Sequence, residues 1–187
     1  MHLPTAKFSR LVTILAFDFS NPSLDSMILT WDHISARLLA RSVDPAAADK
    51  IESIRLLAIH DAVRAIFNQG LGFLYIGTSS GSSLAAALAA TAQASHDVLA
   101  AAFDRPDDRA GLAIVLEECL SLISDVHEKT SGALTGAESA AEFVRNFEPL
   151  ALKPGISISD STPSRVKRNP LRLAQNPRWR YDWQRSA

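Results

Sequence analysis

One short motif in the chain has the residue types and spacing of a catalytic site. Residues 77–81 read Gly-Thr-Ser-Ser-Gly and fit G-x-S-x-G, the turn that exposes the nucleophilic serine of α/β-type serine hydrolases. Residues 73–76 predict a short strand before this turn, and a helix is predicted after it. The motif makes Ser79 a candidate nucleophile, although such a turn needs a parallel sheet and no other convincing strand is present. Its partners would be Asp104 or Asp125 and then His127.

The histidines and paired acids give a weaker signal for metal or acid–base chemistry. No two histidines stand at a metal-binding helical spacing, and no acid lies three residues from one in a ferritin-like pattern. Adjacent acids point to different sides of a helix, so we interpret both pairs as solvated. No phosphate-binding glycine loop with a lysine is present, and we assign no catalytic, cofactor-binding or metal-binding residue. The residues considered are His2, His33, His60, His96, His127, Asp107, Asp108, Glu117 and Glu118.

The elements that would position these residues are predicted to be helical. Alanine is abundant and has the best helix propensity, and apolar residues recur at steps of three and four. We expect an all-α bundle of four to five antiparallel helices. Thr135 would cap the fifth helix in a capping box with Glu138. The predicted helices span residues 24–42, 45–68, 84–103, 106–128 and 136–147.

Three segments are expected along the 187 residues, which suffice for about one domain. An irregular segment covers residues 1–20, the helical bundle residues 21–150, and a basic tail with Pro, Arg and Trp residues 151–187. The tail carries eight Lys or Arg against two Asp, a net charge of about +6, so the rest carries about −7. We interpret the tail as a solvated, poorly ordered end beyond residue 155 and consider nucleic-acid binding unlikely.

Neither a membrane span nor a secretion signal is predicted. No stretch reaches the roughly 18 apolar residues that a spanning helix needs, and the apolar run at residues 11–17 is too short for a signal peptide. The location stays open, with the cytoplasm favoured over secretion. The single cysteine, Cys119, lies in an apolar helical stretch and is expected to be a small core residue.

Residues 25–147 resemble the N-terminal helical half of bacterial vanadium-dependent haloperoxidase-like proteins, in the type 2 phosphatidic acid phosphatase superfamily. The resemblance rests on an Ala-rich helix with His-Asp-Val-Leu at 96–99, an acidic and apolar helix after it, and a Gly-x-x-x-Gly pair. It extends upstream to two earlier segments. The glycine pair is Gly132 and Gly136, and the upstream segments are Ile28–Asp32 and Arg55–Ile59 with Asp61–Val63.

The resemblance implies an oxyanion site for vanadate or a phosphoryl group, but in the second helical half of those proteins. That site is built from a Lys…Arg-Pro segment, a Pro-Ser-Gly-His segment and a Ser-Arg…His segment. None is complete here: Lys153 has no Arg-Pro partner, Ser164 is followed by Arg165 rather than Gly-His, and Leu171 stands where the last histidine would fall. No catalytic residue is carried over, and no cofactor is expected.

Three hypotheses remain open. The first is the scaffold half of a haloperoxidase-like protein without its catalytic motifs: a truncated product, a pseudo-enzyme or one part of a split protein, non-catalytic alone. The second is a helical protein–protein interaction module. The third is a serine hydrolase that uses Ser79. A half-protein should expose the surface that met its other half, so a second chain or a homodimer is expected to cover an exposed helical face.

Overall fold

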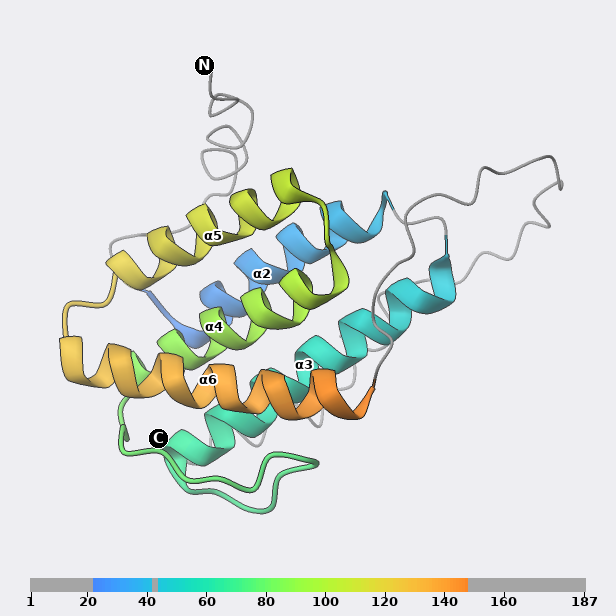
Figure 1. Ribbon diagram of the computed structural model, residues 1–187. Helices are drawn as coiled ribbons and strands as arrows, with labels where there is room; N and C mark the ends of the chain where they lie inside the picture. The colour runs from blue at the N-terminus through green and yellow to red at the C-terminus, as the bar shows by residue number, and fades with distance from the viewer. Residues whose placement is uncertain (1–21, 42–43, 148–187) are drawn as a thin grey trace, which may run out of the picture. The chain divides into compact units, whose positions relative to one another are not determined.

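The computed structural model describes residues 22–41 and 44–147, which form five α-helices. Within these ranges no residue is in a strand, and an all-α helical bundle is confirmed (Figure 1). The predicted segment 1–20 and the basic tail 151–187 lie outside the described residues. The helices are α2 Leu24–Leu39, α3 Pro45–Phe67, α4 Leu84–Ala102, α5 Pro106–Ser121 and α6 Val126–Asn146.

Short polar side chains start the first three of these helices. Ser23 and Ser26 form a capping box at α2. Asp44 accepts hydrogen bonds from the first free N–H groups of α3, and Pro45 occupies the first helical position, where no N–H is needed. Ser83 accepts from Ala86 N at α4. These starts are the ones that the sequence predicts.

Helix α4 is the centre of the bundle, because its many alanines allow the other helices to pack closely against it. It packs against each of the other four helices, and a helix with neighbours on all sides needs small side chains where backbones approach. On α6, Gly132 faces Ala86 and Gly136 faces Ala90, close enough that a Cβ on either glycine would fall on an alanine carbonyl oxygen. Both residue pairs have the same offset, so α4 and α6 run in the same direction (Figure 1).

Large apolar side chains from α2, α3 and α6 fill the space around α4. Burial of each contributes about 1.5–3 kcal/mol relative to exposure, so these residues supply much of the driving force for folding. Consecutive helices alternate in direction (Figure 1). The largest fully buried apolar side chains are Met27, Trp31, Ile51, Val63, Val98, Leu99, Leu112 and Phe143.

The predicted boundary between the fourth and fifth helices is wrong. Helix α5 ends at Ser121 rather than near residue 128, and α6 begins at Val126 rather than at residue 136. Asp125 caps α6 by accepting from Glu128 N at 3.0 Å. Thr135 is therefore inside α6, where its hydroxyl donates to Ser131 O instead of capping. Among the described helices, none has the length and apolar character to cross a bilayer.

Candidate functional site

The candidate site is the connection between α3 and α4, residues 68–83, together with the side chains that hold it. Asp61 on α3 is fully buried. Its carboxylate accepts three consecutive backbone N–H groups of the connection, from Phe73 at 2.9 Å, Leu74 at 2.8 Å and Tyr75 at 3.0 Å. A single carboxylate therefore fixes the backbone at the middle of the connection.

The environment of Asp61 favours its ionised form. Burial raises the pKa of its carboxyl group, but the hydrogen bond from His60 and the three backbone N–H groups outweigh burial, and the net pKa lies below its ordinary value of 3.8. Asp61 is thus a permanent negative charge at neutral pH. Its lone pairs are already occupied by these donors, so the charge serves to hold the connection.

Arg64, one turn further along α3, holds the same connection from its carbonyl side. Its guanidinium donates to the carbonyl oxygens of Gly70 at 3.1 Å, Tyr75 at 3.0 Å and Gly77 at 3.2 Å. Asp61 and Arg64 together satisfy N–H and C=O groups that would otherwise need water. Asn68 and Gly70 turn the chain out of α3 with positive φ values of 51° and 60°.

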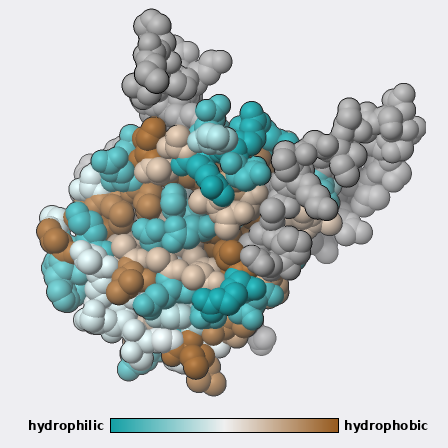
Figure 2. Space-filling model, viewed as in Figure 1, coloured by the Kyte–Doolittle hydropathy of each residue, from teal (hydrophilic) through white to brown (hydrophobic). Residues whose placement is uncertain are grey.

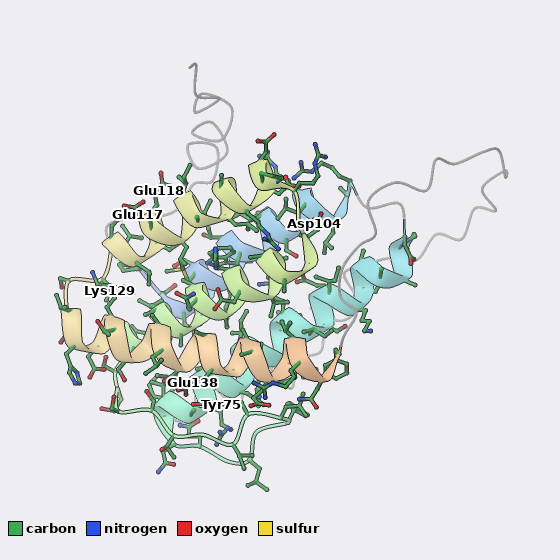
Figure 3. The ribbon with its side chains drawn as sticks, viewed as in Figure 1. Tyr75, Asp104, Glu117, Glu118, Lys129 and Glu138 are labelled. Atoms are coloured by element: carbon green, nitrogen blue, oxygen red, sulfur yellow. The ribbon has the colours of Figure 1, made fainter. Side chains whose placement is uncertain are left out.

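The anchored connection turns one aromatic side chain inward and three apolar side chains outward. Tyr75 is buried, and its hydroxyl donates to Glu138 on α6 at 2.6 Å (Figure 3). Leu71, Phe73 and Ile76 are 91%, 61% and 82% exposed. Figure 2 shows brown, apolar atoms at the lower edge of this face, where Figure 1 places the connection. Such exposure of three large apolar residues within six positions is unusual for a solvated loop.

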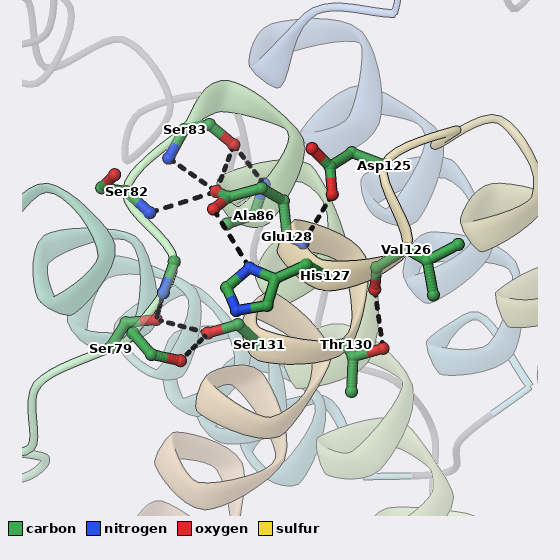
Figure 4. Close-up of polar contacts among 12 residues, drawn as sticks. Ser79, Ser82, Ser83, Ala86, Asp125, Val126, His127, Glu128, Thr130 and Ser131 are labelled. Atoms are coloured by element: carbon green, nitrogen blue, oxygen red, sulfur yellow. Dashed lines mark hydrogen bonds and ion pairs between the residues drawn. The ribbon is translucent and has the colours of Figure 1, made fainter.

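The rest of the connection runs along a polar stripe of α6. Ser80 bonds to Ser131 at 2.6 Å, and Glu128 accepts from the N–H groups of Ser82 and Ser83 and from the Ser83 hydroxyl (Figure 4). The hydrogen bond from Ser83 is the largest cause that holds the pKa of Glu128 below its ordinary 4.5. Glu128 therefore occupies the N-terminal end of α4, where an external anion would otherwise bind.

The structure does not place Ser79 in the strand–turn–helix setting that a nucleophile requires. Residues 73–76 form no strand, so that prediction is wrong. Within the described ranges, the Ser79 hydroxyl has hydrogen bonds with Thr135 at 2.9 Å, Ser131 at 3.3 Å and Gly81 N at 3.1 Å (Figure 4). These contacts tie the motif to α6.

The predicted partners of Ser79 are placed differently from one another. Asp104 follows the far end of α4, about 28 Å along a helix of 19 residues. Asp125 caps α6, and the His127 Nδ1 atom faces Glu128 Oε1 at 3.6 Å while its side chain is 75% exposed. The structure thus brings Asp125 and His127 to the same end of the bundle as Ser79, without a histidine hydrogen bond to Ser79 among the described contacts.

Of the other predicted histidines, His2 lies outside the described residues, and those of α2, α3 and α4 have local contacts. His33 contacts its own helix at Leu29 O, and His60 and His96 each contact the aspartate that follows them. In the described ranges, no three His, Cys, Asp or Glu residues form a group that could hold a metal ion. Burial raises the pKa of Cys119 to about 12, which leaves a thiol rather than a reactive thiolate at neutral pH.

The prediction that Asp107 and Asp108 form a solvated pair is wrong for one of them. Asp108 is buried, and its carboxylate pairs with Arg41 at 3.0 Å, so it ties the first turn of α5 to the end of α2. Asp107 is exposed, as is Glu117. Glu118 is half-buried and lies beside Cys119, whose pKa its charge also raises.

Arg55 forms the second buried polar cluster, within the core. Its guanidinium is fully buried and pairs with Asp32 on α2 and Glu52 on α3, with Ser95 of α4 as a further acceptor at 3.4 Å. Burial opposes its charge, but the hydrogen bond to Glu52 and the charges of Glu52 and Asp32 outweigh burial and raise its pKa. Arg55 therefore links three helices.

The arginines of these two clusters and the N-terminal end of α4 do not fit the oxyanion that the haloperoxidase resemblance implies. A vanadate site needs converging cations and N–H donors that have no other acceptor. Here Arg55 donates to carboxylates, Arg64 donates to carbonyl oxygens, and Glu128 occupies the α4 N-terminal donors. No step of catalysis through vanadate is derived from these residues.

Asp61, Arg64 and Glu128 are the residues that sequence reasoning missed. A usable signal existed for the first: Asp61 falls on the apolar arc of its helix, between Ala58 and Ala62, and a buried charge on such an arc needs partners. For Arg64 and Glu128 no comparable signal exists, because both positions are compatible with a solvated helix face.

Searches with this chain find no match among protein-family models, curated proteins or solved structures. The resemblance to haloperoxidase-like proteins therefore stays a prediction.

Proposed function

We propose that this chain is a non-catalytic helical scaffold that acts by binding a second protein chain, in the manner of the N-terminal helical half of a haloperoxidase-like protein. One observation carries the proposal. The buried carboxylate of Asp61 and the half-buried guanidinium of Arg64 hold a connection whose Leu71, Phe73 and Ile76 side chains face solvent.

The polar groups of the connection face other groups of the protein, which supports a binding function rather than catalysis. A catalytic carboxylate or hydroxyl directs a lone pair or proton at a substrate position. Here Asp61 directs its lone pairs at backbone N–H groups, and Ser79 bonds to the hydroxyls of α6. A connection that is rigid before binding loses little conformational entropy when a partner covers it. Its apolar side chains then contribute by leaving water.

The scaffold part of the proposal draws on the residues that carry the resemblance. Gly132 and Gly136 are the positions where α6 meets Ala86 and Ala90 of the Ala-rich helix. In haloperoxidase-like proteins the oxyanion site belongs to the second helical half, and the helical half that this chain resembles packs against other protein rather than binding the oxyanion.

Calorimetric unfolding of the full chain, with and without orthovanadate, tests the proposal. A ligand that binds only the folded state must raise the unfolding temperature. We expect one cooperative transition that orthovanadate leaves unchanged, and no bromide oxidation when vanadate, peroxide and bromide are supplied together. A raised transition temperature or measurable turnover would overturn the non-catalytic proposal.

A fluorophosphonate probe separates the scaffold from the hydrolase alternative. We expect no labelling of the full chain, with Ser79→Ala as the matched control. Labelling that disappears in Ser79→Ala would overturn the scaffold proposal in favour of a serine hydrolase, because the probe reacts with activated serine hydroxyls.

A further inference from the structure

The exposed apolar side chains of the α3–α4 connection form one candidate docking surface, which we call the apolar loop and define as residues 71–76. With Leu71, Phe73 and Ile76 exposed to 91%, 61% and 82%, it offers roughly 500 Å² of apolar area, as large as the largest patch on a typical monomer. Patches of that size are often functional. The apolar loop is therefore the strongest feature that the scaffold itself does not use.

The backbone of the apolar loop is prepared for burial. The N–H groups of Phe73, Leu74 and Tyr75 donate to Asp61, and the Tyr75 carbonyl accepts from Arg64. A partner that covers the loop would not strand these polar groups, which is the main penalty for burying irregular backbone.

Charge decides which kind of partner fits. Residues 65–96 contain no Asp, Glu, Lys or Arg, and the apolar loop lies within this stretch. The described residues as a whole carry nine Lys or Arg against sixteen Asp or Glu, a net charge of −7. Two copies that meet through the apolar loop bring uncharged segments together, so the net negative charge of the two helical parts does not have to be buried in the contact.

We propose that a second copy of this chain docks on the apolar loop, with the two loops packed against each other about a two-fold axis. This inference rests on the proposed function and names its partner. Each loop contributes about 500 Å², so the pair buries about 1,000 Å², the lower limit of a specific interface. Such a contact makes a weak dimer that dissociates on dilution.

Sedimentation equilibrium of the full chain tests the dimer over protein concentrations from about 1 to about 200 µM. The mass is expected to rise from the 20.2 kDa of one chain towards twice that value. The double variant Leu71→Ser/Ile76→Ser is expected to stay monomeric. At about 1 µM, where both chains are monomers, its unfolding temperature should equal that of the wild-type chain, because both side chains are exposed. Leu29→Ser is the matched control: Leu29 is equally apolar and 56% exposed, but on α2, and this variant should dimerise normally.

Two results would overturn the proposal. One is a monomer at every concentration, or a dimer that the double variant leaves intact. The other is a monomer that floats with phosphatidylcholine vesicles only when Leu71 and Ile76 are present, which would make lipid the occupant. Either result leaves the vanadate and turnover tests untouched, so failure of the dimer and failure of the scaffold function remain distinguishable.

Discussion

The same pair of residue types, a histidine followed by an aspartate, has different roles at Asp61 and at Asp97. Each follows a histidine whose Nδ1 atom contacts the aspartate, at 3.0 Å in the first pair and 2.7 Å in the second. Asp61 is fully buried and accepts three backbone N–H groups. Asp97 is 31% exposed and accepts from Gln93 on its own helix. Burial and backbone donors make only Asp61 a structural anchor.

We predict that Asp61→Asn lowers the free energy of unfolding by about 2–4 kcal/mol, because a buried charge that accepts several hydrogen bonds is replaced by one amide oxygen. The new NH₂ group would face N–H donors. Asp97→Asn is the matched control and should cost less than about 1 kcal/mol, since exposed pairs contribute little. Urea unfolding of both variants measures the difference. Equal losses would contradict the anchoring role of Asp61.

Acidification should remove the contribution of Asp61 to the free energy of unfolding. The folded pKa of Asp61 lies below its ordinary 3.8, so its stabilisation is complete above that value and is lost as the pH falls through the lower folded pKa. The difference in the free energy of unfolding between the wild-type chain and Asp61→Asn should therefore stay constant from neutral pH to about pH 5. It should decrease below about pH 4. Urea unfolding across this range measures it. A difference that already shrinks above about pH 5 would contradict the assignment to Asp61.

At the scale of elements, the parallel contact between α4 and α6 depends on the absence of side chains. Gly132 and Gly136 lie against the backbone of Ala86 and Ala90. Glycine costs about 1 kcal/mol relative to alanine inside a helix. Two glycines in the middle of α6 are therefore a local disadvantage that the closer approach of the two helices must offset.

We predict that Gly132→Ala destabilises the chain by about 1–3 kcal/mol despite the better helix propensity of alanine, because the added methyl group forces the two backbones apart. Ala141→Gly, at an exposed position of α6, should cost only the propensity difference of about 1 kcal/mol. Thermal unfolding monitored by circular dichroism measures both. A stabilised Gly132→Ala variant would show that the contact between α4 and α6 has room for a methyl group.

The helix starts could be predicted from sequence because each depends on a local signal. Asp44 with Pro45, and Ser83, are sufficient caps by themselves. The turn between α5 and α6 could not be predicted in this way. Leu122, Ile123 and Val126 continue the helical spacing of apolar residues across it, so spacing alone hides the break. The local signal at this turn is Asp125, which caps α6, whereas the prediction assigned the cap to Thr135.

The candidate site was less predictable than the helices, because it depends on contacts between distant residues. The connection contacts Asp61 about 12 residues earlier and Ser131 about 50 residues later. Gly77–Gly81 has the composition of a nucleophilic turn, but its role depends on which element precedes it and which lies alongside. A helix before it and a polar stripe of α6 beside it make the segment a packing element.

At the scale of the whole molecule, charge is distributed unevenly along the chain. The described helices carry a net charge of −7, whereas the full chain carries −1, so residues outside the described ranges carry a net charge of +6. Two modes of self-association are therefore conceivable from charge and hydropathy. One joins uncharged apolar loops, and the other joins the basic segment of one copy to the acidic helices of another.

Ionic strength separates these two modes, and we predict that the dimer is at least as tight at about 1 M NaCl as at about 0.1 M. Over that range the Debye length falls from about 10 Å to about 3 Å. Screening reduces repulsion between two acidic helical parts and leaves apolar burial intact. A contact between basic and acidic segments would instead weaken. Sedimentation equilibrium at both salt concentrations measures the dissociation constant. A tenfold or greater loss of affinity at high salt would assign self-association to the charged segments rather than to the apolar loop.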